Sequence, residues 1–250
     1  MKSVKFLVMV ALAGMVMGCS KHSEPVMQEI RIGIGNVQSG SLETKGVADA
    51  LSATAPTGSV QLSLRSVNVS SHQYTVEVGG SVRVPVGRYS VKGAYKPTVL
   101  GTAVFNSVYG EPAYSISQEI EVREGVSEYA VQAGYDCFAL VIDYSECEKY
   151  QWKQWGGTYQ DLSWLKRTGD YGVAYFGMES TWSAGESSFT LLAVPAEPET
   201  KESAEYILSH RTENGVVKVE PGKWYKFGPR DVSFQSGGIG IDYPEWGAGN

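Results

Sequence analysis

Short runs of alternating apolar and polar residues recur along this chain, and glycine or proline separates them. Between residues 58 and 133 these runs cover residues 60–64, 74–78, 82–84, 89–95, 114–122 and 126–132. A period of two is the pattern of a strand with one buried face, and several short strands with turn residues between them are typical of an antiparallel β-sandwich. None of these runs has the helical period of an amphipathic helix. The pattern therefore predicts an all-β domain over residues 58–133.

A second group of strand-like runs begins near residue 134. The runs cover residues 138–144, 171–177, 188–194, 204–210, 216–219, 224–227 and 238–243. Of the 28 Phe, Tyr and Trp residues, 20 lie in residues 135–250. This change in composition favours two sandwich domains over one uniform fold, so we predict a second, aromatic-rich β-sandwich over residues 134–250. We interpret residues 20–57 as a tether, a first strand at 28–36 and a loop, with a candidate short helix at 47–51.

The amino terminus has the features of a bacterial lipoprotein signal peptide. Residues 1–19 contain two lysines, an apolar run of about a dozen residues, and then Gly18 and Cys19. The run is shorter than the roughly 20 residues that a membrane-spanning helix needs. A small residue before a cysteine resembles a lipobox, which predicts that Cys19 is acylated and becomes the first residue of the mature chain. The alternative is an ordinary signal peptide with a chance cysteine. Ser20, rather than Asp, after the cysteine resembles lipoproteins forwarded to the outer membrane, and Glu24 resembles a thin version of the acidic tracts that mark export to the cell surface.

The other two cysteines, Cys137 and Cys147, leave two alternatives open. An even number of cysteines in an oxidising compartment is compatible with a disulfide, and two buried thiols are equally compatible. The spacing does not match a zinc site. Asp143, Glu146 and Glu148 could supply oxygen ligands to calcium, but the spacing of a calcium-binding loop is absent from the sequence. We therefore predict neither a metal site nor a cofactor.

Charge and motifs argue against two classes of function. The net charge is −6, and the sequence has no run of Lys and Arg. A nucleic-acid-binding surface needs clustered positive charge, so we predict no nucleic-acid partner. The sequence also lacks the Gly-x-Ser-x-Gly, His-Glu-x-x-His and phosphate-loop motifs. We therefore predict that the protein is not an enzyme.

An aromatic cluster early in the second domain is the candidate binding site. It comprises Tyr150, Trp152, Trp155, Tyr159 and Trp164, with polar residues between them. Flat aromatic faces can stack on sugar rings or anchor a protein partner. The alternative, which we favour, is that these side chains fill the core of the second domain and its rim.

Three stretches resemble the fimbrillin-like lipoproteins of Bacteroidales. They are "YTVEVGGSVRVPVGRYSVKGAY" at 74–95, "GEPAYSISQEIEVREG" at 110–125 and "EPGKWYKFGPRDVSFQSGGIGIDYPEW" at 220–246. The resemblance implies two antiparallel β-sandwich domains of the fimbrillin or transthyretin-like type. It also implies a role as a pilus subunit, anchor or adhesin, with other fimbrial or envelope proteins as partners.

Two departures from the family bear on polymerisation. The chain is shorter than typical pilin subunits, and it lacks an obvious long loop with a cleavage arginine before its first sandwich strand. These departures favour a non-polymerising surface relative. In the family, a terminal strand is exchanged between subunits, and residues 28–36 are the candidate strand here. The alternative, which we favour, is an ordinary edge strand within its own sandwich.

The sequence as a whole predicts a cell-envelope lipoprotein that works by binding. The first hypothesis is a fimbrillin-like adhesion or assembly component. The second is a glycan-binding lipoprotein for polysaccharide capture that uses the aromatic cluster. Exposed aromatic rings would favour the second hypothesis, and an open sheet edge would favour the first.

Overall fold

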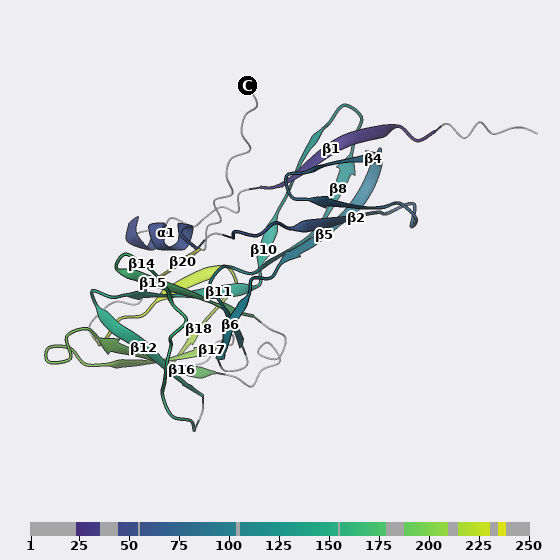
Figure 1. Ribbon diagram of the computed structural model, residues 1–250. Helices are drawn as coiled ribbons and strands as arrows, with labels where there is room; N and C mark the ends of the chain where they lie inside the picture. Colours follow the sequence, from purple (N-terminus) through teal and green to yellow (C-terminus); the bar gives the residue numbers. More distant parts are fainter. Residues whose placement is uncertain are drawn as a thin grey trace, which may run out of the picture.

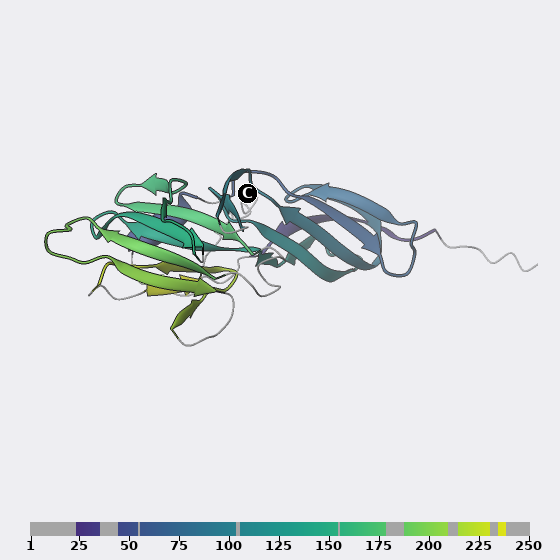
Figure 2. The same cartoon turned by 90° about the horizontal axis from the view of Figure 1, so that it is seen from below.

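Two β-sandwich units lie end to end in the computed structural model of the protein (Figures 1 and 2). The structure describes residues 24–35, 45–54, 56–103, 106–154, 156–178, 188–209, 215–230 and 235–238. Within these ranges all the regular structure is β-strand except one helix, as the sequence predicted. No helix in these ranges is long and apolar enough to cross a membrane. The predicted signal peptide at 1–19, with Cys19, lies outside the described residues.

The N-terminal unit packs a three-stranded sheet against a five-stranded sheet. The first sheet has the order β4 (Ser81–Pro85), β1 (Met27–Ile34), β9 (Glu128–Val131). The second has the order β10 (Ala133–Tyr135), β8 (Tyr114–Val122), β5 (Gly87–Tyr95), β2 (Gln61–Ser66), β3 (Gln73–Glu77). Alternate residues of the strands, such as Ile30, Ile32, Leu62 and Leu64, fill the core between the two sheets. The period of two in the sequence therefore marks the inward faces.

The C-terminal unit packs a seven-stranded sheet against a five-stranded sheet. The first has the order β20 (Gln235–Gly238), β19 (Lys223–Lys226), β11 (Cys137–Asp143), β15 (Tyr171–Gly177), β7 (Asn106–Tyr109), β6 (Val99–Ala103), and β14 (Lys166–Thr168) also pairs with β15. The second has the order β13 (Gln160–Asp161), β12 (Cys147–Gln154), β16 (Phe189–Pro195), β17 (Ala204–Ser209), β18 (Val216–Lys218). The aromatic-rich core lies between these sheets.

Strand β11 is buried on both faces, which explains its continuous apolar sequence. Phe138, Leu140 and Ile142 point into the core between the sheets. Ala139 and Val141 point to the outer face, where helix α1 (Lys45–Ser52) covers the sheet (Figure 1). Val47, Ala50 and Leu51 are the apolar side of this helix. The candidate short helix at 47–51 is therefore present within the segment interpreted as a loop, and it extends over Lys45–Ser52 because it gains its stability by burying that side.

The chain passes back and forth between the two units. After β1 in the N-terminal unit, α1 packs on the C-terminal sheet, and β2 to β5 return to the N-terminal unit. Strands β6 and β7 then join the C-terminal sheet before β8 to β10 complete the N-terminal one. Residues 99–109 thus pair within the C-terminal sheet, although they lie inside the predicted 58–133 domain. Their sequence lacks clear alternation, and their sheet partner, β15, is distant in the chain.

Strand β1 is a central strand of its sheet. It pairs antiparallel with β4 and parallel with β9. Two further pairs are parallel, β11 with β19 and β17 with β18. The expectation of an edge strand at residues 28–36 is therefore wrong, and the sheets are mostly, but not wholly, antiparallel. Strands β1 and β9, like β11 and β19, are far apart in the chain, so the long connections between them allow a parallel pairing.

Candidate functional site

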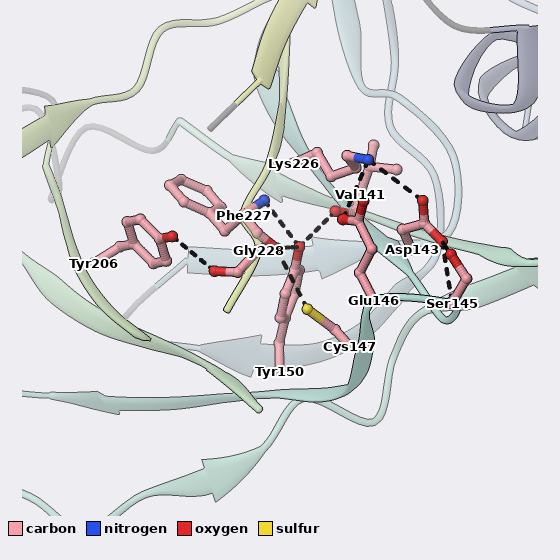
Figure 3. Close-up of polar contacts among 10 residues, drawn as sticks. All are labelled: Val141, Asp143, Ser145, Glu146, Cys147, Tyr150, Tyr206, Lys226, Phe227 and Gly228. Carbon is pink, nitrogen blue, oxygen red and sulfur yellow. Dashed lines mark hydrogen bonds and ion pairs between the residues drawn. The ribbon is translucent and has the colours of Figure 1, made fainter. Parts of the chain in front are cut away.

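A group of charged side chains lies at the end of strand β11 (Figure 3). It is on the face of the seven-stranded sheet that helix α1 covers. Lys226 of β19 has a side chain only 6% exposed, and Asp143 of β11 has one 9% exposed. The Lys226 Nζ lies 3.3 Å from Asp143 Oδ2 and 3.4 Å from Glu146 Oε2. Burying a charge is costly unless it is paired, so these groups stabilise one another.

Ser145 holds the Asp143 carboxylate from the opposite side. Its backbone N–H and its hydroxyl donate hydrogen bonds to Asp143 Oδ1, at 3.0 and 2.6 Å. Burial raises the pKa of Asp143, but the hydrogen bonds from Ser145 and the charge of Lys226 outweigh burial, so this pKa lies below its usual value. Burial and the nearby Asp143 raise the pKa of Tyr171, the neighbour of Asp143 on β15. The resting state of the group is therefore an ion pair.

Tyr150 ties this group to the core of the sandwich. Its ring is fully buried, and its hydroxyl lies 2.8 Å from Val141 O and 2.6 Å from Phe227 O. The backbone N–H of Phe227 donates to the same hydroxyl at 3.0 Å. Burial raises the pKa of Tyr150 well above its usual value. Tyr150 therefore links β12, β11 and the end of β19 through one polar atom (Figure 3).

The five aromatic residues predicted as a binding site do not form one exposed face. Tyr150 is a core residue and is unavailable to a glycan, because the opposing sheet covers it. Trp152 and Trp164 are partly buried and pack against the same core. Tyr159 is half-buried, with the Lys153 ammonium 4.1 Å from its ring centre, and its hydroxyl bonds to Glu205. Trp155 lies outside the described residues. Most of this cluster therefore fills the core of the second domain and its rim, which is the alternative that we favoured from the sequence.

Cys137 and Cys147 are both free, buried thiols, so the disulfide alternative is wrong. Cys137 points to the helix-covered face of the C-terminal sheet, and its thiol contacts Ala113 O. Cys147 points into the core between the sheets, and its thiol contacts Phe227 O. The two side chains therefore lie on opposite sides of the seven-stranded sheet. Burial raises the pKa of each thiol to about 12.

Two of the three carboxylates considered for calcium are already engaged in an ion pair. Asp143 and Glu146 pair with Lys226, and Glu148 is exposed on β12. Among the described residues there is no group of three or more His, Cys, Asp or Glu side chains that could hold a metal ion. Sequence reasoning overlooked Lys226. The sequence did hold a signal for it, which is one charged residue within the aromatic strand at 224–227. A lysine is rarely buried without a partner, so a lysine in such a strand indicates a buried ion pair.

A small pocket of about 200 Å³ lies where the chain passes between the two units. Its lining includes Tyr95, Leu100 and Glu111. The Glu111 carboxylate accepts hydrogen bonds from the Tyr95 hydroxyl and from Thr57, whose hydroxyl lies 2.8 Å away. Burial raises the pKa of Glu111, but these hydrogen bonds and the charge of Lys166 outweigh burial, so this pKa lies below its usual value. Glu111 thus ties the end of β5 and the segment at Thr57 to its own loop.

Strand β6 forms an exposed edge of the C-terminal sheet. Within the described ranges it pairs only with β7. Val99 and Leu100 on this strand are 51% and 49% exposed. An edge strand presents unpaired backbone N–H and C=O groups to a further strand, and apolar side chains beside them favour pairing. This edge is therefore a surface on which an extended segment of a partner could add.

Comparisons with known proteins find similar structures. No protein-family model matches the chain, and no curated protein sequence matches it. Among solved structures, a candidate cell adhesion protein from Bacteroides uniformis aligns over 85% of this chain and 99% of its own, with 9% identity and a TM-score of 0.46. A tip fimbrial protein from Porphyromonas gingivalis aligns over 84% and 97%, with 9% identity and a TM-score of 0.39. A candidate cell adhesion protein from Bacteroides eggerthii aligns over 81% and 85%, with 11% identity and a TM-score of 0.40.

These three structures carry names from the adhesion and fimbrial class that the sequence motifs resemble. Because the identities and the TM-scores are low, we base the function of this chain on its own residues. Two features of the chain bear on its function. The edge strand β6 could pair with a partner, and the buried charged group brings reactive side chains together.

Proposed function

We propose that this protein is a lipid-anchored protein of the outer membrane and cell surface that acts by binding, without catalysis, as a fimbrillin-like adhesion or assembly component. The observation that carries the proposal is the exposed apolar edge of strand β6. Main-chain hydrogen bonds at such an edge supply affinity for an extended segment, and the side chains beside it supply selectivity. The half-exposed Val99 and Leu100 are the side chains that a partner would cover.

The proposed lipid anchor would place the C-terminal unit, with its β6 edge, on the side away from the membrane. Strand β1 begins at Met27, at the end of the N-terminal unit that faces away from the C-terminal unit (Figure 2). Cys19 precedes Met27 by only a few residues, so an acylated Cys19 would hold that end near the membrane. Several acyl chains anchor firmly, since each buried CH₂ contributes about 0.8 kcal/mol. The C-terminal unit and its β6 edge would then face away from the membrane.

The edge is tested with a double lysine variant, Val99→Lys with Leu100→Lys. Charged residues on an edge strand oppose pairing with another strand. Cells that carry this variant should adhere, or assemble surface structures, much less than cells with the wild-type protein. The matched control is Val67→Lys with Val69→Lys, at two exposed valines of the N-terminal unit. Equal adherence of the edge variant and the control, at equal surface amounts, would contradict the proposal.

The anchor is tested separately by Cys19→Ala. This variant should leave the membrane fraction, because it removes the acylated side chain. Cys137→Ala, at a buried thiol, is the control and should stay in the membrane fraction. Retention of the Cys19→Ala protein in the membrane would show that another segment anchors the chain.

A further inference from the structure

The buried Lys226 and Asp143 side chains, with the partly buried Glu146, have the composition and placement of a self-condensing group. A primary amine and a carboxyl group lie in contact, with Nζ 3.3 Å from Oδ2, and a second carboxylate lies 3.4 Å from the same nitrogen. Holding the nitrogen against the carboxyl group in this way removes much of the entropic cost of bringing the two groups together. All three side chains point toward one another in Figure 3.

The sheet holds the two reacting groups in register. Strands β11 and β19 are parallel neighbours, and Val141 is the partner of Lys226. Asp143 lies two residues beyond Val141, and side chains two apart share one face of a strand. The Lys226 side chain therefore reaches Asp143 along the same face. Because both side chains are almost wholly buried, water competes little for either group.

The other contacts of Asp143 lie where charge would develop. When an amine attacks a carboxyl carbon, negative charge accumulates on the carboxyl oxygen that stays. Asp143 Oδ1 already accepts the backbone N–H and the hydroxyl of Ser145, at 3.0 and 2.6 Å. Hydrogen-bond donors placed in advance around such an oxygen stabilise the transition state. Oδ2, which faces Lys226, is then the oxygen that leaves.

Glu146 is placed to carry the protons. Its Oε2 atom is buried and accepts no hydrogen bond within the described residues. The nearest positive group is the Lys226 ammonium. A carboxylate at this distance can take a proton from one reacting group and return it to the other.

We propose that Lys226 and Asp143 condense into an intramolecular amide bond, an isopeptide, with Glu146 as the catalytic proton carrier. The Lys226 ammonium passes one proton through Glu146 to Asp143 Oδ2, which leaves a neutral amine beside a neutral carboxyl group. Nζ then attacks Cγ, the new C–N bond forms, and the displaced π electrons move to Oδ1.

The second half of the reaction releases water. Nζ gives up a second proton through Glu146 to Oδ2, the electrons on Oδ1 restore the C=O bond, and the Cγ–Oδ2 bond breaks. The ion pair and its products, one amide and one water molecule, contain the same atoms and the same zero net charge. No oxidant, reductant or cofactor is needed. The product joins β11 to β19 covalently across 83 positions of the chain.

The bond is tested by tryptic digestion of the purified full-length protein and mass spectrometry. Without the bond, trypsin releases residues 124–149 and residues 224–226 as separate peptides. With the bond, cleavage after Lys226 is blocked, and residues 124–149 appear joined to 224–230 at their summed mass less one water molecule. Fragmentation must place the link at Asp143 and Lys226. Separate peptides in the wild type, with no joined species, would overturn the proposal.

A matched pair of variants tests the role of Glu146. Glu146→Gln removes the proton carrier and should abolish the joined peptide, while tryptophan fluorescence confirms that the C-terminal unit is folded. Glu148→Gln, at the exposed carboxylate two residues along, should yield as much joined peptide as the wild type. A folded Glu146→Gln protein with the wild-type amount of joined peptide would overturn the assignment of Glu146. If Glu146→Gln does not fold, Lys226→Arg decides, because it keeps the positive charge and should give no joined peptide.

Discussion

Replacing Tyr150 by Phe removes one buried oxygen and leaves the ring in place. That oxygen lies 2.8 Å from Val141 O and 2.6 Å from Phe227 O, and it accepts the Phe227 N–H at 3.0 Å. A hydroxyl has one hydrogen, so it donates to one of the two carbonyls at a time and accepts from the N–H. The substitution therefore removes one donated and one accepted hydrogen bond in a site without water access.

The expected loss follows from these two bonds. A buried polar group that loses its partner costs about 1–3 kcal/mol, so Tyr150→Phe should lower the free energy of unfolding by about 2–4 kcal/mol. Tyr206→Phe is the matched control, because the half-buried Tyr206 hydroxyl donates a single hydrogen bond, to Gly228 O at 2.7 Å. That variant should lose only about 1 kcal/mol.

Urea denaturation followed by tryptophan fluorescence measures both losses in the C-terminal unit. All six tryptophans lie beyond Tyr150 in the sequence, so the signal excludes the N-terminal unit. The chain without residues 1–19 avoids the proposed lipid. If Tyr150→Phe were no less stable than Tyr206→Phe, the reasoning that Tyr150 is a buried polar link between strands would be refuted.

Three further predictions concern packing, thiol reactivity and acid stability. Gly101→Val should displace the indole of Trp164, because a Cβ at residue 101 would lie 2.4 Å from its Cε2 atom, and should lower the midpoint of the same fluorescence transition. Cys137 and Cys147 should resist alkylation in the native protein at pH 8 and react fully in urea, because burial raises both pKa values to about 12. The folded pKa of Glu111 is lowered, so its contribution to stability is present above its unfolded pKa and is lost as the pH falls through its folded pKa. Glu111→Gln should therefore lose less stability than the wild type on acidification, as measured by circular dichroism during urea denaturation.

Each of these predictions has a control or a contrary outcome. Gly134→Ala should leave the stability nearly unchanged, since the nearest atom to its added Cβ is 4.0 Å away. Rapid alkylation of either native thiol would contradict its burial. Glu119→Gln, at an exposed carboxylate paired with Arg88, should keep the acid sensitivity of the wild type. An equal acid sensitivity in Glu111→Gln would show that the Glu111 contacts add no stability.

Local pattern was enough to predict most strands. The runs at 114–122 and 171–177 coincide with β8 and β15, because alternation or continuous apolar sequence reports how the two faces of a strand are buried. Strands β6 and β7 were missed, since their positions depend on pairing with a distant strand. Nothing within residues 99–109 encodes that pairing locally.

The site was harder to predict than the fold. Tyr150 has the same aromatic, polar-flanked surroundings in the sequence as a glycan-binding residue, and only the opposing sheet makes it a core residue. Cys137 and Cys147 are close in the chain, but the side on which each points depends on where its strand lies in its sheet. Lys226 gains its meaning from Asp143, 83 positions away. These properties arise from tertiary packing, which a short sequence window does not contain.

The path of the chain between the two units has a consequence for export. In the export that we propose, helix α1 and the β6–β7 hairpin would leave a secretion channel before β11 and β15, the strands on which they dock. Until those strands arrive, the apolar sides of α1 and the hairpin have no surface to cover them, which exposes a nascent chain to aggregation. The strands of the N-terminal unit all lie within residues 27–135, so this unit can fold first, whereas α1 and the hairpin stay uncovered until the C-terminal strands follow. We therefore expect a periplasmic holdase to be needed for this chain more than for a protein whose domains follow one another in sequence.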